Sequence, residues 1–146
     1  MPKPPKLLPR NKRLPLSRSE MMSRIRSRDT LPERRTRALL SRLGIRYRMH
    51  VAGLPGKPDF ANKKRKWVIF VHGCFWHSHR ACKLASRPKS NQSYWGPKLH
   101  RNKERDVSKI EELKRLDYRV LVVWECETRN DRIESRVRKF FANRLL

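Results

Sequence analysis

The sequence predicts an α/β fold in which a central mixed sheet is flanked by helices. Two runs, WVIFV at 67–71 and VLVVW at 120–124, are apolar throughout, as strands buried on both faces are. The segment 97–116 between them has a helical pattern, so the two strands form a parallel pair joined by a right-handed crossover. A chain of 146 residues has the length of one compact domain.

We expect residues 1–18 to form a flexible basic arm and residues 19–146 to form a single domain. The arm contains five of the ten prolines and can bury too little apolar surface to order itself. It is either a solvated tail or a segment that lies along a DNA backbone. A short helix at 20–26 follows it.

The first clear helix is predicted at 31–43. Thr30 and Glu33 have the spacing of a capping box, and Pro32 falls in the first turn. Gly44 closes the helix, because glycine adopts the conformation that ends one.

Strands follow this helix. Apolar and polar residues alternate at 45–51, which indicates a half-buried strand. The turn LPGKP leads to a second strand at 59–62, and the turn KKRK leads to the apolar run at 67–71. After the run at 120–124 the chain ends in a helix whose apolar face consists of Ile133, Val137, Phe140 and Phe141.

All three cysteines can be placed on one metal ion. Parallel strands end at the same edge of a sheet, so Cys74, just past the first apolar strand, and Cys126, just past the second, should lie close together. With His79 and Cys82 they form a set that favours a closed, structural zinc site, which would hold the long loop after the first of these strands. His77 could replace His79 as a ligand, and small buried core cysteines are the alternative to a metal site.

A second group of residues suits chemistry on a phosphodiester. Asp59, on the strand beside the one that ends at His72, can hold Mg²⁺, which prefers hard oxygen ligands. His77 can take a proton from water, and His72 can hold the phosphate or a water molecule. Taken singly, each of these residues is better explained as a surface aspartate or a core histidine. Taken together with the zinc loop, they are not.

The crossover helix supports this assignment independently. Asp106 and Asn102 lie in the middle of the face that should be buried, and buried polar groups need partners. Asp106 can bond a ring nitrogen of a site histidine and set its tautomer. A helix cap or an ordinary buried hydrogen bond is the alternative. The full stripe consists of Leu99, Asn102, Asp106, Ile110 and Leu113.

Charge indicates the partner. The chain has 38 Lys and Arg against 13 Asp and Glu, a formal net charge of +25, which favours a polyanion such as nucleic acid over a merely solvated basic surface or a membrane-surface binder. No apolar run is long enough for a membrane span, and the first residues lack the apolar core of a signal peptide. We therefore expect a cytoplasmic protein, where an odd cysteine count indicates metal rather than disulfides.

Five segments resemble, in order and spacing, the very-short-patch-repair mismatch endonucleases of bacteria: LPGKPDF (54–60), WVIFVHGCFWHSH (67–79), SYW (93–95), NKERD (102–106) and RVLVVWECE (119–127). The resemblance implies a restriction-endonuclease-like, three-layer fold. It also implies an enzyme that uses Mg²⁺ beside a structural zinc. Such an enzyme nicks double-stranded DNA 5′ of the thymine in a T:G mismatch left by deamination of 5-methylcytosine. We expect it to act as a monomer and to be linked functionally to a cytosine-5 DNA methyltransferase.

The resemblance also implies roles for single residues. Asp59 and the main-chain carbonyl of Val71 bind Mg²⁺, although a family member carries threonine at the position of Val71. Glu33 matches an acidic position tied to the active site, and its capping role explains it equally well. The remaining assignments are His72, His77 and Asp106 in catalysis, Asn102 in support, and Cys74, His79, Cys82 and Cys126 on zinc.

The resemblance gives Phe75, Trp76 and Trp95 the role of an aromatic wedge that enters the base stack. Inserting apolar side chains costs least at a mismatch, where the step is already weakly paired. Ordinary core packing is the alternative for Phe75 and Trp76.

Three functions remain. The first is a mismatch-directed nicking endonuclease. The second is a related nicking nuclease with relaxed mismatch specificity or a restriction role, which would share every catalytic residue. The third is a non-catalytic, zinc-containing basic protein, which would need neither Asp59 nor two free histidines.

Overall fold

The computed structural model describes residues 29–87 and 89–142. The expected arm at 1–18 and the expected short helix at 20–26 lie outside the described residues. The account that follows concerns the compact unit that begins at Leu31.

The centre of this unit is a four-stranded sheet in the order β1-β2-β3-β4. The pairs β1/β2 and β2/β3 are antiparallel, and β3/β4 is parallel, so the sheet is mixed as predicted. The strands are β1 (Arg48–Met49), β2 (Phe60–Asn62), β3 (Trp67–His72) and β4 (Arg119–Trp124).

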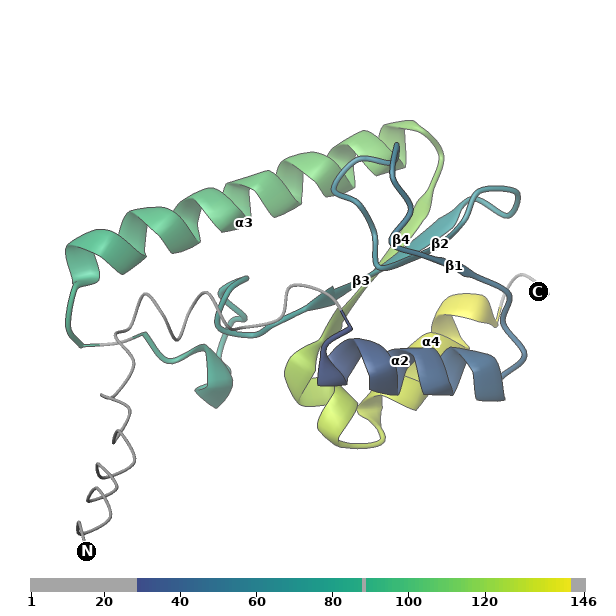
Figure 1. The fold of residues 1–146 in the computed structure, drawn as a ribbon, viewed down its shortest axis with the longest axis horizontal. Coiled ribbons are helices and arrows are strands. Elements are labelled where there is room, and N and C mark those ends of the chain that lie inside the picture. Colours follow the sequence, from purple (N-terminus) through teal and green to yellow (C-terminus); the bar gives the residue numbers. More distant parts are fainter. Residues whose placement is uncertain (1–28, 88, 143–146) are drawn as a thin grey trace, which may run out of the picture. The chain divides into compact units, whose positions relative to one another are not determined.

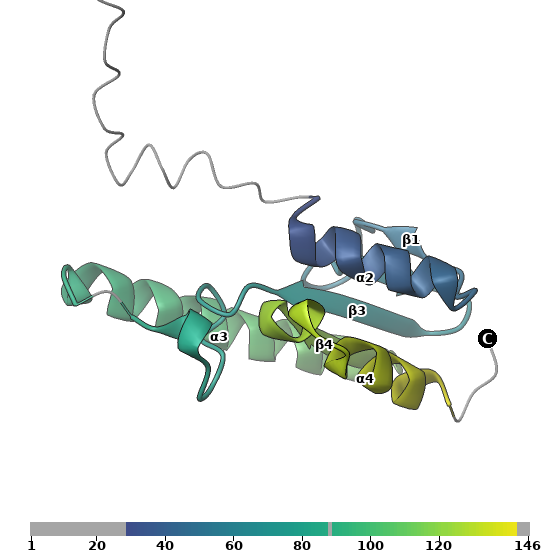
Figure 2. The ribbon, with the colours of Figure 1, turned by 90° about the horizontal axis from the view of Figure 1, so that it is seen from below.

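Helices cover both faces of the sheet and make three layers (Figures 1 and 2). The long crossover helix α3 (Gln92–Arg115) lies on one face, while α2 (Leu31–Arg42) and α4 (Arg132–Phe141) lie on the other. Alternate residues of β3 pack against the helices on opposite faces of the sheet. Val68 and Phe70 pack with the α3 side, and Trp67 and Ile69 pack with the α2 and α4 side. The predicted three-layer α/β fold is confirmed.

Most element boundaries agree with the sequence prediction, including the helix end at Gly44, which has a φ of +72°. The strand predicted at 45–51 is wrong in extent, because only Arg48–Met49 pair with β2. His50 has a φ of +48°, in the left-handed region, and this conformation ends the strand.

The predicted start of the crossover helix at 97 is also wrong. The helix begins at Gln92, and Pro97 lies inside it. Proline removes one backbone hydrogen bond there, but burial of Trp95, which is 3% exposed, holds the additional turn against the rest of the molecule. The SYW segment is therefore helical rather than part of the loop. Within the described residues, no helix combines the length and the apolar character that crossing a membrane requires.

Candidate active site and metal centre

Two segments that are distant in sequence meet just beyond the ends of β3 and β4. His72 and Trp124, the last residues of these strands, are paired in register. Cys74 and Cys126 each follow two residues later, so the parallel register brings them to one edge of the sheet. The Cys126 amide donates a hydrogen bond to Cys74 Sγ at 3.4 Å, which confirms the predicted approach of these two cysteines.

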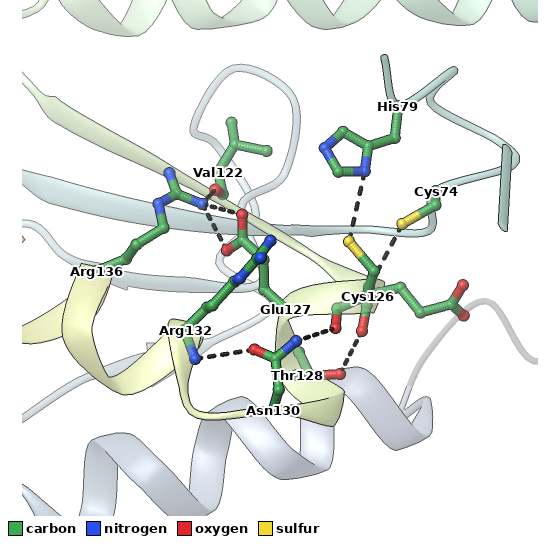
Figure 3. Close-up of polar contacts among 10 residues, drawn as sticks. Cys74, His79, Val122, Cys126, Glu127, Thr128, Asn130, Arg132 and Arg136 are labelled. Carbon is green, nitrogen blue, oxygen red and sulfur yellow. Dashed lines mark hydrogen bonds and ion pairs between the residues drawn. The ribbon is translucent and has the colours of Figure 1, made fainter. Parts of the chain in front are cut away.

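A cluster of potential metal ligands surrounds this contact. Cys126 Sγ lies 3.5 Å from His79 Nδ1 (Figure 3). Burial raises the pKa of the Cys74 thiol, so a thiolate at this position needs a neighbouring cation. Three sulfurs and one imidazole are the donor set of a closed tetrahedral zinc site. The cluster, whose donor atoms all lie within 4.8 Å of one another, consists of Cys74, His79, Cys82 and Cys126.

The turn that carries Cys126 is anchored from the last helix. This turn is the short 3-10 helix η2 (Glu125–Arg129). Arg136 of α4 donates from Nη1 to the Val122 carbonyl at 2.9 Å and to the Glu127 carboxylate at 2.6 and 2.7 Å (Figure 3). Charge-assisted bonds of this kind fix the turn against the end of β4, and so fix the position of Cys126.

Two histidines form a stacked pair beside the cysteine cluster. The rings of His72 and His77 have centroids 3.8 Å apart and planes 5° apart. Asp106 Oδ2 lies 2.5 Å from His77 Nδ1. An ionised carboxylate can only accept, so Nδ1 carries the hydrogen and Nε2 of the neutral ring is left able to take a proton. Burial, and secondarily the charge of His77, lowers the pKa of His72 to about 4, which keeps that ring neutral at neutral pH.

Both polar residues in the buried stripe of α3 have partners on the loop after β3. Asn102 donates from Nδ2 to the Trp76 carbonyl at 3.2 Å, and Asp106 bonds His77 one helical turn further on. The expected contact between Asp106 and a site histidine is therefore present. These two bonds tie the loop to the crossover helix at the point where the histidine pair sits.

Asp59 lies just before β2, with its side chain turned to the neighbouring strand. The Val71 amide donates to Asp59 Oδ2 at 2.6 Å. Burial is the largest cause that raises the pKa of Asp59, to about 6, and the nearby charge of Glu33 raises it further. The Val71 amide opposes these effects by bonding the ionised form. Glu33 is itself only 4% exposed, so a buried carboxylate lies close to the half-buried carboxylate of Asp59.

Asp59 and the two active-site histidines belong to neighbouring groups of donor atoms. The donor atoms grouped with Asp59 belong to Glu33 and His50, whereas His72 and His77 group with Asp106. The bond to the Val71 amide holds the Asp59 carboxylate one residue short of the strand end. The charge on His77 still lowers the pKa of Asp59, so the two groups are electrostatic neighbours within one site.

The predicted wedge residues form one aromatic cluster. Phe75 and Trp76 are half-buried, and their rings pack edge to face with centroids 5.1 Å apart. Trp95 packs against Phe75 at 5.3 Å and against Trp76 at 6.0 Å, but it is buried, so it reaches DNA only if the rings that cover it move. Tyr94, at 56% exposed, is the open ring of this cluster.

Three residues at the site were missed by reasoning from the sequence. His50 lay in a segment assigned to a regular strand, where alternation placed it on the polar face. Tyr94 lay in the SYW segment and was passed over. Trp124 packs against both His72 and His79, and its position as the last residue of an apolar strand that precedes a zinc ligand was the available signal.

A solved structure shares this fold. The catalytic domain of the homing endonuclease I-Bth0305I superimposes with a TM-score of 0.55 and 24% sequence identity. The match covers 80% of this chain and 99% of that domain. The fold is therefore that of an endonuclease catalytic domain.

Sequence comparison gives the family. The model of the DNA mismatch endonuclease Vsr family matches residues 11–84. The chain is 44% identical over 113 residues to the DNA mismatch endonuclease Vsr of Escherichia coli, covering 77% of this chain and 72% of that protein. It is 43% identical over 125 residues to the type II nicking enzyme V.XorIIP of Xanthomonas oryzae, covering 85% and 91%. The chain belongs to the DNA mismatch endonuclease Vsr family, as the resemblance predicted.

Proposed function

We propose that this endonuclease nicks double-stranded DNA 5′ of the thymine in a T:G mismatch, in very-short-patch repair. Family membership supports the proposal, together with E. coli and X. oryzae relatives whose names are those of a mismatch endonuclease and a nicking enzyme. The observation that carries it is the contact between His77 and Asp106 beside the half-buried Asp59, because this arrangement suits water-dependent cleavage of a phosphodiester.

His77 is the proposed general base. Hydrolysis requires a water molecule to lose a proton as its oxygen attacks phosphorus, and Nε2 of His77 is the ring atom left to receive it. Asp106 stabilises the imidazolium that results and holds the ring in the correct tautomer. His72, stacked on His77 and kept neutral by burial, can donate a hydrogen bond to a phosphate oxygen without adding a second positive charge.

Asp59 and the main-chain carbonyl of Val71 are the proposed holders of Mg²⁺. The half-buried carboxylate of Asp59 and the buried carboxylate of Glu33 supply negative charge and hard oxygen atoms, which fits a divalent cation. When bound, such an ion offsets phosphate charge and lowers the pKa of water. Asp59→Ala should therefore abolish nicking while DNA affinity stays largely intact, since that affinity comes mainly from phosphate contacts.

Zinc is proposed to be structural. The Cys74, His79, Cys82 and Cys126 cluster closes the loop that carries His77 and the aromatic rings, so a bound ion would fix their positions. Phe75, Trp76 and Trp95 are the proposed wedge, with Tyr94 and Lys98 at its open side. Lys98 Nζ lies 5.4 to 5.8 Å from the ring centroids of Trp76, Tyr94 and Trp95.

The origin of the substrate supports the cellular context that we propose. Deamination converts 5-methylcytosine into thymine opposite guanine, so the mismatch depends on a cytosine-5 DNA methyltransferase. We propose a monomer that acts on DNA in the bacterial cytoplasm, with residues 1–18 as a basic arm that precedes a single catalytic domain. The net charge of +25 is consistent with DNA as the partner.

The test is a nicking assay on duplexes that differ only at one base pair. Each of the possible mismatches and the matched duplex are compared, with and without Mg²⁺. The expected result is Mg²⁺-dependent nicking confined to T:G, on the thymine strand. Equal nicking of several mismatches would favour the runner-up, a nuclease with relaxed specificity or a restriction role. No nicking of any duplex by zinc-loaded protein would reject the nuclease proposal.

A further inference from the structure

We propose that His50 is a metal ligand, and that Glu33, His50 and Asp59 together form a site that binds Mn²⁺ more tightly than Mg²⁺. The inference rests on the proposed function only in taking Asp59 as a metal holder. It adds a nitrogen ligand that neither the sequence patterns nor the family resemblance assigned.

The three side chains converge from three different elements. Glu33 is on α2, His50 follows β1, and Asp59 precedes β2. One donor atom from each lies within 4.8 Å of the other two, and His50 Nε2 is 3.6 Å from Glu33 Oε2. The His50 amide also donates to the Asp59 carbonyl at 3.0 Å, which fixes these two residues relative to each other.

The backbone of His50 is held in an unusual conformation. Its φ of +48° lies in the left-handed region, which costs free energy for a residue other than glycine. The surrounding structure maintains this conformation at the point where the imidazole meets two carboxylates. A regular strand would give alternating directions to the side chains at 48–51, so this φ sets where the ring of His50 points.

The electrostatics of the group favour a cation. Glu33 is buried and Asp59 is half-buried, and two carboxylates this close together repel each other when both are ionised. A divalent cation shared by the three donors would offset this repulsion.

The donor set decides which cation. Mg²⁺ prefers an all-oxygen shell and loses water reluctantly, whereas imidazole suits transition metals. One nitrogen and two carboxylates therefore favour Mn²⁺ over Mg²⁺. The soft thiolates of the cysteine cluster favour zinc. Mn²⁺ added to zinc-loaded protein therefore binds at Glu33, His50 and Asp59 and not at the cysteine cluster.

The histidine pair is a poorer alternative for the same ion. The rings of His72 and His77 lie nearly parallel, 3.8 Å apart, so their lone pairs run side by side and do not converge on one point. Nδ1 of His77 is already bonded to Asp106.

The first measurement is a titration of zinc-loaded protein with Mn²⁺, followed by electron paramagnetic resonance in the absence of DNA, with Mg²⁺ as competitor. Wild-type protein should bind Mn²⁺ more tightly than Mg²⁺. His50→Gln, which keeps a neutral polar side chain, should weaken Mn²⁺ binding by about tenfold or more and leave Mg²⁺ binding unchanged. His100→Gln, at an exposed histidine on α3, is the matched control and should change neither.

The second measurement detects the ligand itself. Pulsed paramagnetic resonance of the Mn²⁺-loaded protein should show coupling to an imidazole nitrogen that is lost in His50→Gln and kept in His100→Gln and His77→Gln. The proposal is overturned if the coupling survives in His50→Gln, or if wild-type protein binds the two ions equally. Zinc content and circular dichroism report whether each variant is folded, and His50→Asn replaces His50→Gln if the latter is not. Failure of T:G nicking in Mg²⁺ would count against the proposed function alone.

Discussion

The indole ring of Trp124 stacks on the imidazole of His79, with ring centroids 4.1 Å apart and planes 11° apart. The same indole makes a T-shaped contact with His72, with ring centroids 5.3 Å apart, and His72 in turn stacks on His77. One side chain at the end of β4 thus touches both the cysteine cluster and the histidine pair. Through these ring contacts, a well-ordered zinc site can help to fix the position of His77, the proposed catalytic base.

Trp124→Leu should therefore slow nicking without removing zinc. Aromatic pairs are worth roughly 0.5 to 1.5 kcal/mol, so loss of correct ring positions corresponds to a decrease of about two- to tenfold in the single-turnover rate. Trp124→Phe should restore most of it. If zinc content falls in parallel with the rate in Trp124→Leu, Trp124 supports only the cysteine cluster, and its proposed link to the histidines is wrong.

Asp106→Asn tests the tautomer argument. The amide keeps the shape of the carboxylate but loses the charge that stabilises His77 in its protonated form, and its NH₂ group can hold the ring in the wrong tautomer. We expect the single-turnover rate to fall by about 10² to 10⁴, the range of general-base catalysis, with DNA affinity retained. Glu104→Gln removes an exposed carboxylate from the same helix and should leave the rate unchanged.

How far the sequence predicts the site depends on what fixes each contact. The proximity of Cys74 and Cys126 could be predicted because strand direction and register alone determine it. His50 could not be found this way, because a left-handed φ is a property of one residue that the alternating pattern hides. The burial of Trp95 was missed because Pro97 was assigned to the helix start, which left the SYW segment in an exposed loop.

The pH dependence of stability should reveal the raised pKa of Asp59. Its folded-state pKa of about 6 lies above the usual value of 3.8, so the carboxyl group favours folding when protonated. That contribution is fully present below about pH 4 and is lost as pH rises through 6. His72, with its lowered pKa, acts in the opposite sense over an overlapping range, so the wild-type curve alone is not diagnostic.

Comparison with Asp59→Asn separates the two effects. The measurement is made without added divalent cation. The unfolding free energy of the variant minus that of wild type should increase by on the order of 2 kcal/mol from pH 4 to pH 7. Urea unfolding at both pH values measures it. A difference that does not change with pH would mean that Asp59 is ionised without cost, and that its carboxylate is better solvated than its burial indicates.

Cys126→Ser tests the ligand set of the proposed zinc. Structural zinc contributes to folding free energy, so the variant should bind less than one zinc per chain and should unfold at lower temperature. Cys126→His returns a zinc ligand at the same place and should recover part of both losses. Metal analysis of protein purified without chelator is the decisive measurement, since wild-type protein that contains no zinc would refute the assignment.

Trp76→Ala separates mismatch recognition from general DNA binding. A chain with a net charge of +25 binds any duplex by releasing counterions, and this affinity falls steeply with salt for matched and mismatched DNA alike. The contribution of a wedge to the binding free energy depends instead on how easily a base step opens. Stacking of a base on an aromatic ring is worth about 1 to 3 kcal/mol.

Removal of the half-buried Trp76 ring should therefore lower T:G nicking by roughly one to two orders of magnitude, with the salt dependence and the affinity for matched DNA unchanged. Tyr94→Ala, at the exposed ring of the same cluster, shows whether any accessible aromatic has this effect. Zinc content must stay at the wild-type level, because Trp76 also accepts the Asn102 bond through its carbonyl and packs on Phe75. If Trp76→Ala weakens matched and mismatched binding equally while zinc is retained, the ring belongs to the core and does not enter the base stack.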